Sequence, residues 1–181
     1  MAALLFHYGI EQPLWHQVGL IQAGPLLADS NCSIRLQTPE LAALQQALRR
    51  RGSPPYGPLI HYTDPFLLQA APLRGLRQWQ GPRLLACGDL HHGNSPIETL
   101  AAYLEAEPHD AVLLTFNPAL VAEVRKRLRV PVRSLPPTFF RYPSAVPVER
   151  PLLQLLHVGS LGPHHPRRRE LVAGLQARGR L

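Results

Sequence analysis

The chain has 181 residues, a formal net charge of +7 at pH 7, and 45% hydrophobic against 17% charged residues. This length is sufficient for one domain with its own core, and the apolar content excludes a disordered chain. The apolar runs are far shorter than the ~20 residues of a membrane-spanning helix, and two cysteines cannot form a disulfide framework, so we expect a cytoplasmic protein.

Short apolar runs alternate with helical patterns along the first 135 residues. Strands are expected at 4–8, 34–36, 59–62, 84–87, 111–116 and 130–135. Helices are expected at 41–48, 97–104 and 120–128, where leucine and valine recur every three or four residues. This alternation predicts an α/β fold, a Rossmann-like and mostly parallel sheet with helices on both faces. Right-handed crossovers then bring all strand-to-helix loops to one edge of the sheet.

Proline follows a helix-capping residue at four positions, which are Thr38, Asp64, Ser95 and Asn117. Proline at the first helical position loses only an N–H that the helix would leave unpaired, so these pairs predict helix starts. Ser95 and Glu98 also have the spacing of a capping box.

Five prolines between residues 136 and 151, with no helical period, predict an extended linker. A strand at 152–158, a glycine turn at 159–163 and a helix at about 166–178 follow it. Because a single strand and helix cannot bury their own apolar faces, we expect residues 152–181 to be the first βα unit of an incomplete second domain. The first domain is expected to span residues 1–135.

Ligands of parallel α/β sheets bind beyond the carboxyl ends of the strands. The residues expected there are Gly9, Thr63–Asp64, Gly88–Ser95, Thr115–Asn117, Pro137–Thr138 and Gly159–Ser160. The loop 88–95 is the richest in polar groups. Since imidazole titrates near neutral pH, His91 or His92 is the candidate general base or positioning group, with Asp89 orienting it.

Two other interpretations of the loop 88–95 stay open. Asp89, Leu90 and His91 have the Asp-x-His spacing of zinc deacetylases and of the first metallophosphoesterase motif, which suggests a metal-dependent hydrolase using Asp89, His91 and His92. Alternatively, both histidines only bond to loop backbone. His7, His61 and His157 lie in or beside expected strands and are expected to be satisfied within the sheet.

The positive charge comes almost wholly from arginine, since Lys126 is the one lysine among 19 basic residues. A basic chain attracts phosphate groups of many kinds, so a non-enzymatic module that binds nucleic acid or phosphorylated ligands is a further alternative. Aromatic residues do not interleave with the arginines except at 139–142, which disfavours nucleic acid. A solvated basic surface without a ligand is the remaining explanation.

The stretch 155–171, LLHVGSLGPHHPRRREL, resembles the opening of the C-terminal domain of GT-B glycosyltransferases, of the group-1-like and spore-maturation-protein-like type. In that family a strand ends in Val-Gly-Ser, and a helix that begins with arginine follows. The resemblance implies two Rossmann-like domains, with the acceptor on the first and a nucleotide-sugar donor on the second. It also implies that Gly159 and Ser160 form the turn at the donor phosphates, and that Arg167 or Arg168 faces the diphosphate.

On this resemblance the chain is the N-terminal half of a GT-B glycosyltransferase with the start of its donor domain. It would transfer a sugar from a nucleotide-sugar to a glycan or other acceptor. Neither a cofactor nor a bound metal is expected, nor a membrane span or a nucleic acid partner. Because most of the C-terminal domain is missing, we expect this chain alone to be inactive.

Overall fold

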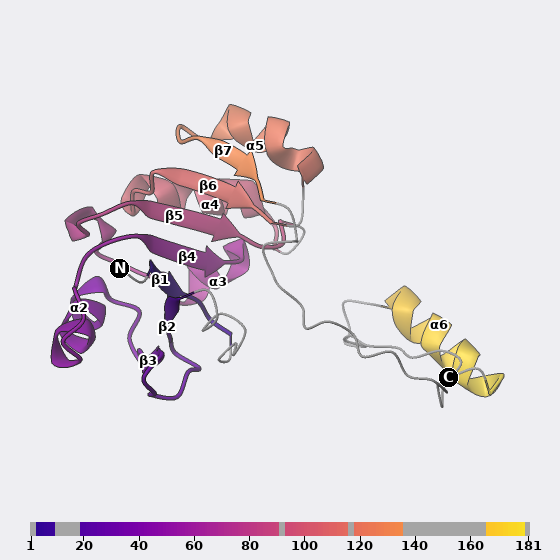
Figure 1. Ribbon diagram of the computed structural model, residues 1–181. Helices are drawn as coiled ribbons and strands as arrows, with labels where there is room; N and C mark the ends of the chain where they lie inside the picture. Colours follow the sequence, from indigo (N-terminus) through magenta and orange to yellow (C-terminus); the bar gives the residue numbers. More distant parts are fainter. Residues whose placement is uncertain (1–2, 10–18, 91–92, 116–117, 136–165, 180–181) are drawn as a thin grey trace. The chain divides into compact units, whose positions relative to one another are not determined.

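The computed structural model describes residues 3–9, 19–90, 93–115, 118–135 and 166–179 (Figure 1). The chain divides into two units, residues 1–142 and 143–181, and each is described by itself. The first unit contains a seven-stranded sheet in which every pair of neighbouring strands is parallel. The strands are β1 (Ala3–Phe6), β2 (Leu20–Gly24), β3 (Ser33–Arg35), β4 (Leu59–Thr63), β5 (Arg83–Cys87), β6 (Ala111–Leu114) and β7 (Val132–Ser134).

Four described α-helices connect these strands. They are α2 (Leu41–Arg50), α3 (Pro65–Ala70), α4 (Pro96–Ala106) and α5 (Val121–Arg127), with two short 3-10 turns, η1 (Leu76–Gln78) and η2 (Pro118–Leu120). The predicted α/β, Rossmann-like fold is therefore confirmed. Within the described ranges, no helix is long and apolar enough to cross a lipid bilayer.

In the strand order β3-β2-β1-β4-β5-β6-β7, the sideways direction in which the chain adds strands reverses between β1 and β4. From β1 the chain builds outward to β2 and β3, and then it crosses back to β4 and builds outward on the other side (Figure 1). Such a topological switch point is where open α/β sheets bind ligands, because the loops on its two sides diverge.

The core is centred on a lateral row of side chains that runs across four strands. Phe6, His61, Leu85 and Val112 are in register with one another, and none of them is exposed to solvent. Leucines of α2 pack against the β1 end of this face, and leucines of α4 pack against the β5 and β6 end. Paired residues of neighbouring strands project to one face, so His61 occupies a position that is otherwise apolar.

Helices α3 and α4 begin at the predicted prolines, Pro65 and Pro96, whereas the start of α2 and the capping box of α4 differ from the prediction. Helix α2 begins at Leu41 rather than at Pro39, because Glu40 forms an isolated parallel bridge with Arg74 and the amide of Arg74 donates to the carbonyl of Pro39. The predicted capping box at the start of α4 is wrong. Ser95 makes no side-chain cap bond, and Glu98 pairs instead with Arg127 of α5 at 2.6 Å.

A buried carboxylate joins the end of α4 to the turn η1. The Glu107 carboxylate accepts a hydrogen bond from the Leu76 amide at 2.7 Å. We expect Glu107→Ala to lower the free energy of unfolding by about 2 kcal/mol, because it leaves a buried N–H without its acceptor. Glu107→Gln keeps an oxygen acceptor and is expected to cost less than half as much in urea denaturation. Equal losses in both variants would contradict this role of the hydrogen bond.

The second unit contains helix α6 (Pro166–Ala177) among its described residues. Its side chains are mostly exposed, and Val172 is the buried one among those described. The predicted strand 152–158 and the turn 159–163 lie outside the described residues.

Candidate functional site

The candidate site is the edge of the sheet formed by the carboxyl ends of β1, β4, β5 and β6. Residues 7–9 follow β1, Thr63 ends β4 and is followed by Asp64, residues 88–89 follow β5, and Thr115 follows β6. Because all these strands are parallel neighbours, their carboxyl ends share one edge. The described residues of the loops after β1, β4, β5 and β6 thus lie together around the switch point, as predicted.

Two aspartates are linked at the centre of this edge. The Asp64 carboxylate accepts a hydrogen bond from the Asp89 amide at 2.7 Å, and the Gly88 amide donates to the Thr63 carbonyl at 3.0 Å. Asp64 occupies the N-cap position of α3 but makes no side-chain cap bond there. Its carboxylate instead reaches across to the loop after the next strand, which sets the direction in which that loop leaves the sheet.

Gly88 is required by this close approach. A β-carbon built on Gly88 would lie 1.9 Å from Asp64 Oδ1 and 3.4 Å from the Tyr62 hydroxyl. The position beside the Gly88 α-carbon is therefore occupied by the Asp64 carboxylate, and a side chain cannot share it.

We expect Gly88→Ala to displace the Asp64 carboxylate and break its bond to the Asp89 amide. The expected results are a large shift of the Asp89 amide resonance and a loss of about 2 kcal/mol in unfolding free energy, from overpacking and the lost charge-assisted bond. Asp64→Asn, which keeps a carbonyl acceptor, is the control and should leave the Asp89 resonance near its original position. An unchanged Asp89 resonance in Gly88→Ala would contradict the described contact.

Cys87, the last residue of β5, is not a nucleophile in this setting. It is fully buried, and burial together with the negative charges of Asp64 and Asp89 raises the pKa of its thiol far above the usual value. The reactive species of a cysteine is the thiolate, which this environment disfavours.

His7 holds the turn after β1 and is not available as a base. Its Nε2 lies 3.1 Å from Gln22 Oε1, and its Nδ1 accepts a hydrogen bond from the Gly9 amide at 3.2 Å. Burial lowers the pKa of His7, so the ring is neutral, and the two contacts assign the proton to Nε2. The prediction that His7 is satisfied within the sheet is confirmed.

Hydroxyl groups at this edge also have structural partners. The Tyr8 hydroxyl donates to the Ala71 carbonyl beyond α3, and the Thr115 hydroxyl donates to the Cys87 carbonyl at 3.0 Å. Burial raises the pKa of Tyr8 far above its usual value, so it stays protonated. Asp64 and Asp89 are the acidic side chains among the described residues of this edge.

The predicted site residues are only partly within the described chain. Asp89 lies at the edge as expected, whereas His91, His92, Gly159 and Ser160 lie outside the described residues. Arg167 and Arg168 are exposed in the first turn of α6, in the second unit. Within the ranges that the structure describes, no three histidine, cysteine or acidic side chains are grouped so that they could hold a metal ion.

The sequence analysis missed the Asp64–Asp89 link and the His7–Gln22 pair. The position of Asp64 directly after a strand indicated a place at this edge. Because a proline follows it, Asp64 could equally be explained as a helix cap. Gln22 carried no signal, because one polar residue in an apolar run looks like an exposed position.

The strand order and the all-parallel pairing define the first unit as a Rossmann-like α/β domain. Beyond this class, neither family models, nor curated proteins, nor solved structures give a significant match to the chain. Because one fold serves many activities, the function has to be argued from the chemistry of the site.

Proposed function

We propose that the first unit is the acceptor-binding domain of a GT-B-type glycosyltransferase, which receives a sugar from a nucleotide-sugar. The observation that carries the proposal is the acidic pair Asp64 and Asp89 at the switch-point edge of a Rossmann-like sheet. Carboxyl groups form hydrogen bonds with sugar hydroxyls, and a switch point is the usual ligand position. The resemblance of residues 155–171 to the start of a donor domain supports the same function.

In this proposal Asp64 acts as a positioning residue. By holding the Asp89 amide, it orients the start of the loop that continues to His91 and His92. His91 or His92 then removes the proton of the acceptor hydroxyl, and the Asp89 carboxylate orients that imidazole.

The donor side is assigned to the second unit. Arg167 and Arg168 are exposed at the start of α6, and guanidinium groups match the oxygens of a diphosphate in geometry and charge. Gly159 and Ser160 would form the neighbouring turn. The pyrophosphate of the donor would lie against this helix start, whose free N–H groups favour an anion.

Titration of the ¹⁵N-labelled chain with a panel of monosaccharides and disaccharides tests the acceptor assignment. We expect at least one saccharide to shift the amides of Gly9, Gly88 and Asp89, and we expect Asp89→Asn to weaken its binding about tenfold. Glu105→Gln, an exposed carboxylate at the end of α4, is the matched control and should bind as the parent chain does. Binding that is weakened equally by both variants, or no binding at all, would contradict the proposal.

Binding of uridine and guanosine diphosphates tests the donor assignment. We expect Arg168→Gln to weaken the binding of the more tightly bound nucleotide by about tenfold, which is the loss expected for one charge-assisted hydrogen bond. Arg178→Gln, near the other end of α6, is the matched control and should change the affinity less than twofold. Equal effects of the two substitutions would show attraction to net charge alone.

A second candidate function, a metal-dependent hydrolase, is favoured by the positions of Asp64 and Asp89 just beyond the ends of two paired parallel strands. Adjacent carboxylates at strand ends are suitable ligands for divalent cations. Elemental analysis of the purified chain should then find about one equivalent of zinc or manganese, which Asp89→Asn and His91→Ala remove. Metal-free protein that still binds a saccharide would exclude this candidate.

A further inference from the structure

A groove of about 540 Å³ lies between the edge strand β3 and helix α2, and it involves none of the residues of the candidate site. Ile34 and Leu36 contribute apolar side chains from the strand side, and Ala43 and Ala47 contribute small ones from the helix. Gln37 and Thr38, both exposed, add amide and hydroxyl groups at the carboxyl end of β3. This volume is within the range typical of small-molecule sites.

The groove is strongly basic. Three arginines line it, Arg35, Arg50 and Arg51, against a single carboxylate, that of Asp29. In the described part of the chain, Asp29 pairs with Arg51 at 2.7 Å, and neither Arg35 nor Arg50 forms an ion pair. Two guanidinium groups with no acidic partner among the described residues therefore border one concave surface.

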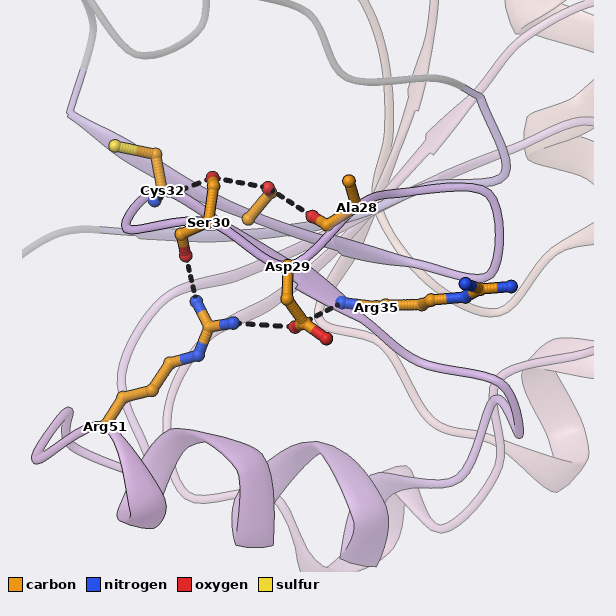
Figure 2. A network of polar contacts seen from close by, with 7 residues as sticks. Ala28, Asp29, Ser30, Cys32, Arg35 and Arg51 are labelled. Carbon is orange, nitrogen blue, oxygen red and sulfur yellow. Dashed lines mark hydrogen bonds and ion pairs between the residues drawn. The ribbon is translucent and has the colours of Figure 1, made fainter.

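One wall of the groove is held in place by a polar network (Figure 2). Arg51 donates to the Ser30 carbonyl at 2.6 Å and to Asp29 Oδ1 at 2.7 Å, and the same carboxylate oxygen accepts the Arg35 amide at 3.0 Å. Figure 2 shows the Arg35 side chain extending away from this network, so that its guanidinium group takes no part in it. Arg51 and Asp29 thus fix the wall, while Arg35 remains available to a ligand.

We propose that this groove binds a small phosphate-bearing molecule with several hydroxyl groups, of the chemical class of the sugar phosphates. Guanidinium groups bind phosphate oxygens through charge-assisted, often bidentate hydrogen bonds, which assigns the phosphate to Arg35 and Arg50. Gln37 and Thr38 suit the hydroxyl groups, since both side chains donate and accept hydrogen bonds. The small side chains of Ala43 and Ala47 leave room for the body of the ligand.

Nucleic acid fits the groove less well. Its lining contains no aromatic side chain, and stacking of bases on aromatic rings is the usual sequence-independent source of affinity for single strands. The arginines surround a single concave surface, which is sufficient for a small ligand. The site is independent of the proposed glycosyltransferase function.

Calorimetric titration with glucose 6-phosphate, glucose and inorganic phosphate tests the proposal on the whole chain. We expect glucose 6-phosphate to bind, inorganic phosphate to bind more weakly, and glucose not to bind. Arg35→Gln and Arg50→Gln should each weaken the binding of glucose 6-phosphate about tenfold or more, because each removes a charged partner of the phosphate. Arg49→Gln is the matched control, an exposed neighbour on α2 outside the groove lining, and should change the affinity less than twofold.

Because Arg35, Arg49 and Arg50 are all exposed, the three variants are expected to unfold at the same temperature as the parent chain. Absence of glucose 6-phosphate binding would overturn the proposal, and so would equal losses in the Arg35, Arg49 and Arg50 variants. Inorganic phosphate binding as tightly as the ester would show that the groove does not recognise the sugar. Tighter binding of a random single-stranded oligonucleotide, lost in Arg35→Gln, would assign the groove to nucleic acid instead.

Discussion

Lowering the pH from 7 to 5 is expected to destabilise the first unit by at least about 2 kcal/mol. The cause is a pair of neutral histidines in the core. The rings of His61 and His109 are stacked with their centroids 5.7 Å apart, and both side chains are buried. Burial lowers the pKa of His109 to about 4 and that of His61 well below its usual 6.5.

The hydrogen bonds of the two rings explain why neither accepts a further proton easily. The Tyr103 hydroxyl donates to the Leu73 carbonyl and lies 3.2 Å from His61 Nδ1, so that nitrogen carries the proton. His109 Nδ1 donates to the Glu107 carbonyl at 2.9 Å. Among the described residues, neither Nε2 atom has a hydrogen-bond partner. A proton added there would create a buried cation without an acceptor.

The direction of the effect follows from proton linkage. Below pH 6.5 the unfolded chain binds protons on these histidines, whereas the folded unit leaves His109 neutral until about pH 4. The free energy of unfolding therefore falls as the pH falls from 6.5 toward 4, and His109 alone accounts for about 2 kcal/mol by pH 5. At neutral pH and above, His109 is mostly neutral in both the folded and the unfolded chain, so this loss of stability is nearly absent.

Urea denaturation at pH 7 and pH 5 of the parent chain and of His109→Asn provides the measurement. Asparagine can still donate to the Glu107 carbonyl but does not titrate in this range. The free energy of unfolding should differ between pH 7 and pH 5 by about 2 kcal/mol less in the variant than in the parent chain, whatever the stability of the variant at pH 7. The same pH dependence in both proteins would show that His109 is not buried in its neutral form.

Gly24→Ala is expected to be the most destabilising single-methyl substitution near the candidate site, at about 3 kcal/mol. A β-carbon on Gly24 would lie 2.0 Å from the carbonyl oxygen of His7, which is backbone and cannot rotate away. The turn after β1 would have to move, and with it the His7–Gln22 contact and the adjacent switch-point edge.

Thermal and urea unfolding of Gly24→Ala beside Gly19→Ala separates this contact from a general effect of replacing glycine. Gly19 has a φ of +70° and nothing within 4 Å of a built β-carbon, so its substitution should cost only about 1 kcal/mol of backbone strain. Equal losses in the two variants would show that the chain at His7 moves aside without cost.

The regular elements with a clear apolar period were predictable from the sequence, and those whose buried faces include polar groups were not. Helices α2 and α4 follow their leucine spacing closely. Strand β2 was missed because Gln22 interrupts its apolar run, although that side chain is fully buried against His7. Likewise, Glu107 and His109 are buried in a segment that looks polar and exposed in the sequence.

The candidate site shows a different limit. That Asp64 and Asp89 share an edge follows from two parallel strands, and it could be predicted. That the Asp64 carboxylate bonds to the Asp89 amide depends on the register of β4 and β5, in which Thr63 is paired with Cys87. A one-residue change of that register would separate the two residues, and no local pattern specifies it.

The network around Asp29 also governs how the sheet ends. Among the described strands, β3 is the last one on its side of the sheet. Its outward-facing Arg35 amide donates to the Asp29 carboxylate, and its outward-facing Ser33 carbonyl accepts from the Ser30 amide. An extended peptide or a second copy of this chain would have to displace both contacts before it could add a strand at this border. The preceding loop therefore hinders the addition of further strands at the β3 edge. Asp29→Ala, which removes the acceptor of the Arg35 amide, should make the chain more prone to self-association.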